Sequence, residues 1–200
     1  ADVLDESFRT ALEGESRNFR ESSSSLLFAF GLAIILIFLV MAAQFESFKD
    51  PFVIMFTVPM ALFGALLFMW MFGVTMNIYS QIGIIMLIGL VTKNGILMVE
   101  FANQRQQAGL NKQKAIIEAS LQRLRPILMT SISTVLGLLP LMFASGEGAN
   151  GRIAMGTAVV GGLLTSTLLT LFVVPVMYIY FSTDREVKEK KKKEEKLRNV

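Results

Sequence analysis

The chain has 200 residues, of which 53% are hydrophobic and 18% are charged, and its formal net charge is +3. It contains no cysteine and no histidine, which excludes disulfide and thiol chemistry and removes the commonest metal ligand and proton-transfer side chain. The sequence also lacks a Ser/His/Asp set, a nucleotide-binding loop and a cluster of metal ligands. We therefore expect no enzyme activity, no cofactor, no bound metal and no nucleic-acid partner.

Five apolar segments dominate the sequence, each about 18 residues or longer and nearly free of charge. They are residues 26–45, 52–72, 81–101, 127–144 and 153–181. A helix needs about 20 apolar residues to cross the hydrocarbon core of a bilayer. The segments lack the alternation of apolar and polar residues that is typical of barrel strands. We therefore expect helices, in which each segment satisfies its own backbone hydrogen bonds. The sequence predicts an all-α polytopic membrane protein with five transmembrane helices.

Residues 1–25 are polar, carry mixed charges and lack the apolar core of a signal peptide. We interpret them as the end of a soluble domain and a linker. Because the chain begins without methionine, we expect it to be a fragment. The serines of 22–25 have two interpretations, which are N-cap hydroxyls at the start of the first helix and a flexible joint to the membrane.

Prolines and a charged stretch predict the internal shape of the bundle. Pro51 suits the start of the second span, and Pro59 should kink that span, because proline removes a backbone hydrogen bond. Residues from about 105 to 124 have an apolar side and a basic side, which predicts an amphipathic helix on the membrane surface. Arg125 and Pro126 then begin the fourth span.

Small or hydroxyl side chains recur at helical spacing in two spans. The fourth span has Thr130, Ser133 and Gly137, and the fifth has Ala154, Ala158 and Gly162. Such stripes let helices approach closely. The stripe of the fourth span has a second interpretation, the handling of protons or ions, and the sequence leaves both open.

The distribution of lysine and arginine predicts the orientation. If the basic tail at residues 182–200 is cytoplasmic, the loops at 46–50 and 103–125 lie on the same side. These three segments hold 14 of the 19 lysine and arginine residues. Cytoplasmic loops carry such an excess, so we expect the amino terminus outside and the carboxyl terminus inside.

Lys93 is the most informative residue, because it lies near the middle of the third span. A charge at the centre of a bilayer is costly and is rare unless it faces a partner or a water-filled cavity. The alternative is a lysine that extends to the headgroups. The boundary near Phe101 is about eight residues away, or roughly 12 Å along a helix. This is a long distance for a lysine side chain to reach the headgroups. No span has an acidic residue away from its ends, so we expect the partner carboxylates on helices outside this chain.

Four stretches of the sequence together resemble a known family. They are GLVTKNGILMVEFA at 89–102, LRPILMTS at 124–131, VMAAQFESF at 40–48 and TVPMAL at 57–62. The chain closely resembles the resistance–nodulation–division efflux transporters, in the hydrophobe/amphiphile class of Gram-negative inner membranes. The resemblance covers nearly all of residues 22–181 and corresponds to the last five of the family's twelve transmembrane helices.

The resemblance implies part of a proton-driven antiporter that exports hydrophobic and amphiphilic compounds. It implies a homotrimer that docks a periplasmic adaptor and an outer-membrane channel, with residues 1–25 ending a periplasmic porter domain. The family's drug-binding pocket and most of its helices lie outside this chain, so no substrate-binding residue can be assigned.

The resemblance also implies the roles of single residues. The family's relay lysine falls on Lys93, its relay threonine on Thr130 and its cytoplasmic-side arginine on Arg123. Asn94 and Ser133 are possible neighbours of this relay. The family's paired aspartates lie on a helix that the chain does not contain, which agrees with the expectation that Lys93 pairs outside it.

Two alternatives remain. Methionines at 69, 71 and 76 lie near one end of the second span and could suit Cu(I), as in the related heavy-metal efflux class. Methionine is also a common filler of apolar helices. The other alternative is a membrane fragment that does not transport.

Overall fold

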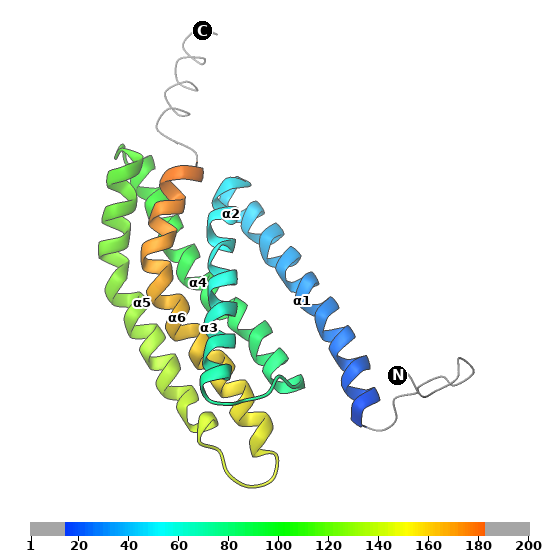
Figure 1. Ribbon diagram of the computed structural model, residues 1–200. Coiled ribbons are helices and arrows are strands. Elements are labelled where there is room, and N and C mark those ends of the chain that lie inside the picture. Colours follow the sequence, from blue (N-terminus) through cyan, green and yellow to red (C-terminus); the bar gives the residue numbers. More distant parts are fainter. Residues whose placement is uncertain (1–14, 183–200) are drawn as a thin grey trace, which may run out of the picture.

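The computed structural model describes residues 15–182, and side chains from Ser25 onward. They form six helices: α1 (Glu15–Phe45), α2 (Lys49–Met55), α3 (Thr57–Met71), α4 (Ile78–Gln107), α5 (Lys112–Met142) and α6 (Ala149–Phe181). This described part contains no strand, which confirms the all-α fold (Figure 1). Most of the predicted domain end at residues 1–25 and of the tail at 182–200 lies outside the described residues.

Five stretches of helix are long and apolar enough to cross a membrane, as the sequence predicted. They are Ser25–Phe45, Lys49–Met71, Ile78–Gln107, Lys112–Met142 and Ala149–Phe181. Large apolar side chains such as Leu36, Trp70 and Phe172 are exposed on the outside of the bundle. A surface of this kind suits lipid rather than water. The chain is therefore a multi-pass membrane segment.

The four serines at 22–25 lie inside α1, which begins at Glu15. They are neither its N-cap nor an interruption of it, so the structure agrees with neither sequence interpretation. The helix continues through them because hydroxyl side chains are tolerated in a helix that is already nucleated on both sides.

The second span is interrupted at Phe56, between α2 and α3. Pro59 has no backbone N–H to offer the carbonyl of Met55 four residues earlier, so the hydrogen-bond ladder cannot continue there. The Thr57 hydroxyl donates to the Ile54 carbonyl at 2.7 Å and satisfies another group at the break. The disturbance predicted from Pro59 is confirmed, about one turn before the proline itself.

The separate surface helix predicted over residues 105–124 is not found, and this expectation was wrong. Helix α4 continues to Gln107, and after a short turn α5 runs unbroken through Pro126. The buried residues of α5 lie on one stripe that crosses the proline: Ala115, Ala119, Ile127 and Ser131 are spaced by multiples of four. Packing of this stripe keeps the helix continuous where proline alone would favour a break.

Helix α6 is the centre of the bundle and packs against α3, α4 and α5. Its small residues are the reason, since Ala154, Ala158 and Gly162 are all buried. A methyl group at Gly162 would overlap the Leu87 side chain of α4 and lie 3.0 Å from the Ala61 carbonyl oxygen of α3. The close approach predicted from the spacing of these residues is confirmed.

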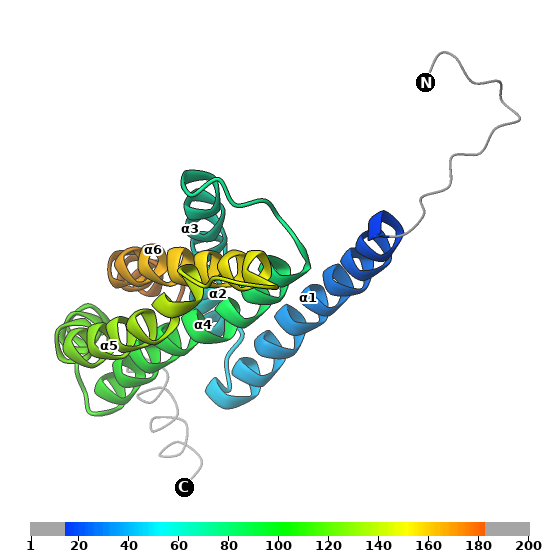
Figure 2. The ribbon, with the colours of Figure 1, turned by 90° about the horizontal axis from the view of Figure 1, so that it is seen from below.

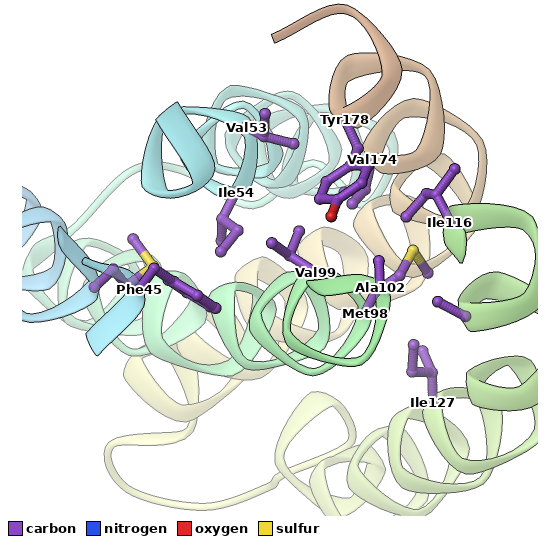
Figure 3. Close-up of a cluster of buried hydrophobic side chains, with 12 residues drawn as sticks. Phe45, Val53, Ile54, Met98, Val99, Ala102, Ile116, Ile127, Val174 and Tyr178 are labelled. Carbon is purple, nitrogen blue, oxygen red and sulfur yellow. The ribbon is translucent and has the colours of Figure 1, made fainter. Parts of the chain in front are cut away.

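Helix α1 is the least packed span. Only 6% of its most apolar 18-residue stretch is buried, against 56% of the corresponding stretch of α4. It contacts the rest mainly through α2 and α4, and it diverges from the bundle toward its amino-terminal end (Figures 1 and 2). A core cluster near the other end of α1 joins Phe45 to Ile54, Val99 and Tyr178 (Figure 3).

Candidate functional site

Lys93 lies near the middle of α4, on the side that residues 15–182 leave uncovered. Its neighbours Thr92 and Asn94 are 3% and 5% exposed, whereas Lys93 itself is exposed. The Thr92 hydroxyl donates to the Ile88 carbonyl at 2.8 Å, which ties that side chain to its own helix. The rotation of α4 about its axis therefore turns the lysine away from the core of the chain.

A shallow depression of about 30 Å³ brings Lys93 together with polar side chains of α5. Its lining residues are Leu90, Lys93, Asn94, Thr130, Ser131, Thr134 and Leu163. A volume of this size has room for about one water molecule. The structure thus places the predicted relay lysine and relay threonine in one site, across the contact between α4 and α5.

Behind Lys93, three polar side chains hold α4, α5 and α6 together. Asn94 Nδ2 donates to Ser131 Oγ at 3.4 Å, and Thr167 Oγ1 donates to the same oxygen at 3.0 Å. All three residues are buried. Asn94, expected as a neighbour of the lysine, does line the site. Sequence reasoning gave no role to Ser131 or Thr167, although isolated hydroxyls in apolar spans were the available signal.

The polar stripe of α5 is only partly in the depression. Thr130 lines it, with its hydroxyl donating to the Ile127 carbonyl at 3.1 Å, but Ser133 does not. Thr134, one residue further on, takes the place expected for Ser133 and donates to the Thr130 carbonyl at 2.8 Å. Ser133 and Gly137 are exposed, so this stripe packs against no helix in residues 15–182.

Arg123 lies apart from the depression. It precedes Thr130 by two turns of α5, or about 10 Å at 1.5 Å per residue. Its guanidinium carbon is 4.9 Å from the centre of the Phe101 ring, and Arg105 lies over the same ring at 5.0 Å. Arg105 also pairs with Glu118 at 3.1 Å. The structure therefore brings together two of the three predicted relay residues and places the third nearer the end of the bundle.

A buried polar cluster at the end of the bundle was missed by sequence reasoning. Asp50 accepts hydrogen bonds from Asn103 Nδ2 at 3.0 Å and from the Ser182 hydroxyl at 2.6 Å. The Tyr178 hydroxyl donates to Asn103 Oδ1 and accepts from Gln106 Nε2 at 2.9 Å. We call these five residues the end cluster. Asp50 stands between Lys49 and Pro51 in what reads as a surface turn, so the sequence gave no signal of its burial.

The site contains no carboxylate among its lining residues, and the described residues hold no group of three or more acidic, histidine or cysteine side chains that could bind a metal. A lysine in the middle of a bilayer-spanning helix nevertheless needs a counter-charge or water. Both would have to reach Lys93 from the uncovered side of α4.

A five-span bundle that presents a lysine and a threonine midway along an uncovered face has the features of the membrane part of a transporter. Residues 2–182 match the AcrB/AcrD/AcrF family, and the chain belongs to that family. It is a membrane segment of the resistance–nodulation–division type.

The comparison with curated proteins agrees with this assignment. An uncharacterised transporter of Haemophilus influenzae is 45% identical over 192 residues, which are 92% of this chain and 19% of that protein. Multidrug resistance protein MdtC of Pectobacterium atrosepticum is 42% identical over 185 residues, 92% of this chain and 18% of its own length. MdtC of Proteus mirabilis is 41% identical over 193 residues, 96% of this chain and 19% of its length. The chain spans about a fifth of the length of these relatives.

Proposed function

We propose that the chain supplies the last five membrane helices of a proton-driven antiporter that exports hydrophobic and amphiphilic compounds. In this proposal Lys93 and Thr130 belong to the proton relay that couples proton entry to export. Relatives named as multidrug resistance proteins support the class of transport, and the depression between α4 and α5 supports the relay.

The observation that carries the proposal is the position of Lys93. This lysine lies midway along a span and is exposed on a face that residues 15–182 leave uncovered. A charge there is stable only if another helix brings a carboxylate or if water enters. The family resemblance implies that paired aspartates lie on a helix outside this chain. A lysine that alternates between such carboxylates can couple protonation to helix movement.

Arg123 fits an auxiliary role on the cytoplasmic side of the relay. Its charge is held over the Phe101 ring of α4, the helix that carries Lys93. A cation over an aromatic ring is stabilised by about 0.5–2 kcal/mol, which is weak enough for the arginine to change partner during a cycle.

The assembly follows from the same resemblance. We propose a homotrimer in a Gram-negative inner membrane, with the amino terminus periplasmic, the carboxyl terminus cytoplasmic, and a periplasmic adaptor and outer-membrane channel as partners. The uncovered faces of α4 and α5 are then covered by the remaining helices of the same transporter.

The metal-efflux alternative has less support. A Cu(I) site needs thioether sulphurs that converge on one point. Met69 is 4% exposed and packs in the core, whereas Met71 is 63% exposed. These two side chains do not share a face of the span.

The test is dye efflux from cells that carry the complete transporter with Lys93→Met. Methionine keeps the bulk and removes the charge, so we expect efflux to fall below detection at unchanged abundance in the membrane. Met86→Leu is the matched control, because Met86 lies two turns away on the same uncovered stripe and carries no charge. Undiminished efflux in Lys93→Met would contradict the proposal.

A further inference from the structure

The uncovered stripe of α4 changes character at Lys93. Before it, the exposed residues are Tyr79, Ile82, Met86 and Gly89, whose only polar side-chain group is the Tyr79 hydroxyl at the start of the helix. After it, the residues at the same helical angle are Glu100, Gln104 and Gln107, of which Glu100 is half-buried and the two glutamines are exposed. Spacings of seven, four and three residues keep all of them on one face of a helix. One side of Lys93 is therefore apolar, and the other is lined with groups that hold water.

A polar cavity of about 370 Å³ lies on this second half of the stripe. Its lining residues are Gln44, Phe45, Glu46, Glu100, Asn103, Gln104 and Gln107. At roughly 30 Å³ per molecule, it has space for on the order of ten waters. Amides and carboxylates provide most of its walls, so water is the natural content. The cavity opens at the end of the bundle that the basic loops predict to be cytoplasmic.

Glu100 is the titratable group of the cavity closest along the helix to Lys93. It follows the lysine by seven residues, or about 10 Å along the helix axis. Ile96 and Leu97 lie between them and are only half-buried. The small depression at Lys93 and the large cavity are thus separated by about 10 Å along α4, a gap that a chain of a few waters would bridge.

The surroundings of Glu100 are acidic. Glu46 lines the same cavity and lies in the turn between α1 and α2. Its backbone is in the left-handed region, with φ of 48°. From α2, Asp50 contacts the cavity wall indirectly, since it accepts from Asn103. Among the described residues that line the cavity there is no lysine or arginine. The described lining therefore offers two carboxylates, Glu46 and Glu100, as proton acceptors.

From this arrangement we propose that Glu100 receives the proton that leaves the lysine site and passes it to the cytoplasm through the amide-lined cavity. The Glu100 carboxylate takes one proton from the water chain and becomes a carboxylic acid. It then gives that proton to water in the cavity and returns to the carboxylate, so that one proton moves and nothing else changes. This inference rests on the proposed antiport, and it adds a residue and an exit route to it.

The test uses the complete transporter reconstituted in liposomes, with proton flux followed during export while the pH on the cytoplasmic face is varied. Glu100→Gln keeps the shape and polarity of the side chain but cannot carry a proton. We expect its maximal export rate to fall about tenfold, with an unchanged KM for the drug and a much weaker dependence on cytoplasmic pH. Glu100→Asp should restore most of the rate and the pH dependence.

Glu147→Gln is the matched control, because Glu147 is an exposed carboxylate in the turn between α5 and α6. It should behave as the unmodified transporter. A Glu100→Gln protein with normal rate, or with a rate lowered equally at every pH, would overturn the inference. If Lys93→Met abolishes proton flux while Glu100→Gln does not alter it, the inference fails and the antiport proposal stands. Normal flux in Lys93→Met removes the antiport proposal itself.

Discussion

Two groups of polar side chains lie in this apolar bundle, and they differ in how completely the chain surrounds them. In the end cluster, Asp50, Asn103 and Tyr178 are each at most 3% exposed and are joined by hydrogen bonds. At the lysine site, Lys93 is exposed, and within residues 15–182 no hydrogen bond or ion pair reaches its ammonium group. A polar group that finds its partners within the chain stabilises the fold, whereas one that is left exposed is available to partners outside the chain.

The comparison predicts that changes in the end cluster act on stability and that changes at the lysine site act on transport. The largest effect on stability is expected for Asn103→Leu, which removes the side-chain amide that donates to the buried Asp50. Loss of a hydrogen bond to a buried charged group destabilises by about 2–3 kcal/mol. Thermal unfolding of the purified complete transporter measures the effect. Gln113→Leu, at an exposed position of α5, is the control, and equal unfolding of both variants would argue against the assigned role of the cluster.

Tyr178→Phe should have a smaller effect on stability. It removes only the hydroxyl that joins Gln106 to Asn103 and leaves the buried ring in place, so about 1–2 kcal/mol is expected. The same unfolding measurement applies. The pH profile of efflux should keep its shape, and a shifted profile would move Tyr178 from the structural group to the functional one.

Thr130→Val tests the open site more gently than a change at Lys93. The hydroxyl can be replaced by water more easily than a charge can. Efflux should fall about two- to tenfold, equivalent to one neutral hydrogen bond, with little change in unfolding. Dye efflux at matched abundance measures it, and a variant as inactive as Lys93→Met would show that the hydroxyl is indispensable.

Ser133→Ala should have the smallest effect. Ser133 is exposed and does not line the depression, so stability should stay within about 0.5 kcal/mol and efflux should be unchanged. The comparison of Ser133→Ala with Thr130→Val is the informative one. A crippled Ser133→Ala beside a silent Thr130→Val would mean that the working face of α5 is rotated from the one described.

The sequence predicted the fold class and the five spans because length and apolar content alone determine whether a helix can cross a bilayer. It failed at residues 105–124, where charge and Pro126 suggested two helices. From Lys112 onward the structure has one long helix, because a buried stripe on both sides of the proline outweighs the local preference. Local patterns do not report the strength of packing against distant helices.

The site was predictable to the extent that single residues reveal their environment. Lys93 could be singled out because a charge in an apolar span is rare, and its pairing with Thr130 in one depression came from resemblance rather than from spacing. Ser131 and Thr167 were missed, as was Asp50, because each depends on a contact between segments far apart in the sequence. Which of Ser133 and Thr134 faces the lysine depends on helix rotation, which no motif states.

The glycines of α6 have a mechanical consequence. Gly161 and Gly162 leave no space between α6 and side chains of α3 and α4, and Gly64 of α3 meets Thr165 in the same way. Helices in such contact cannot slide past one another unless these side chains move, so we expect α3, α4 and α6 to behave as one rigid unit. Under the proposed antiport, movement around Lys93 would shift this block as a whole against its surroundings. Within residues 15–182, the sparsely packed α1 is the helix least tied to this block.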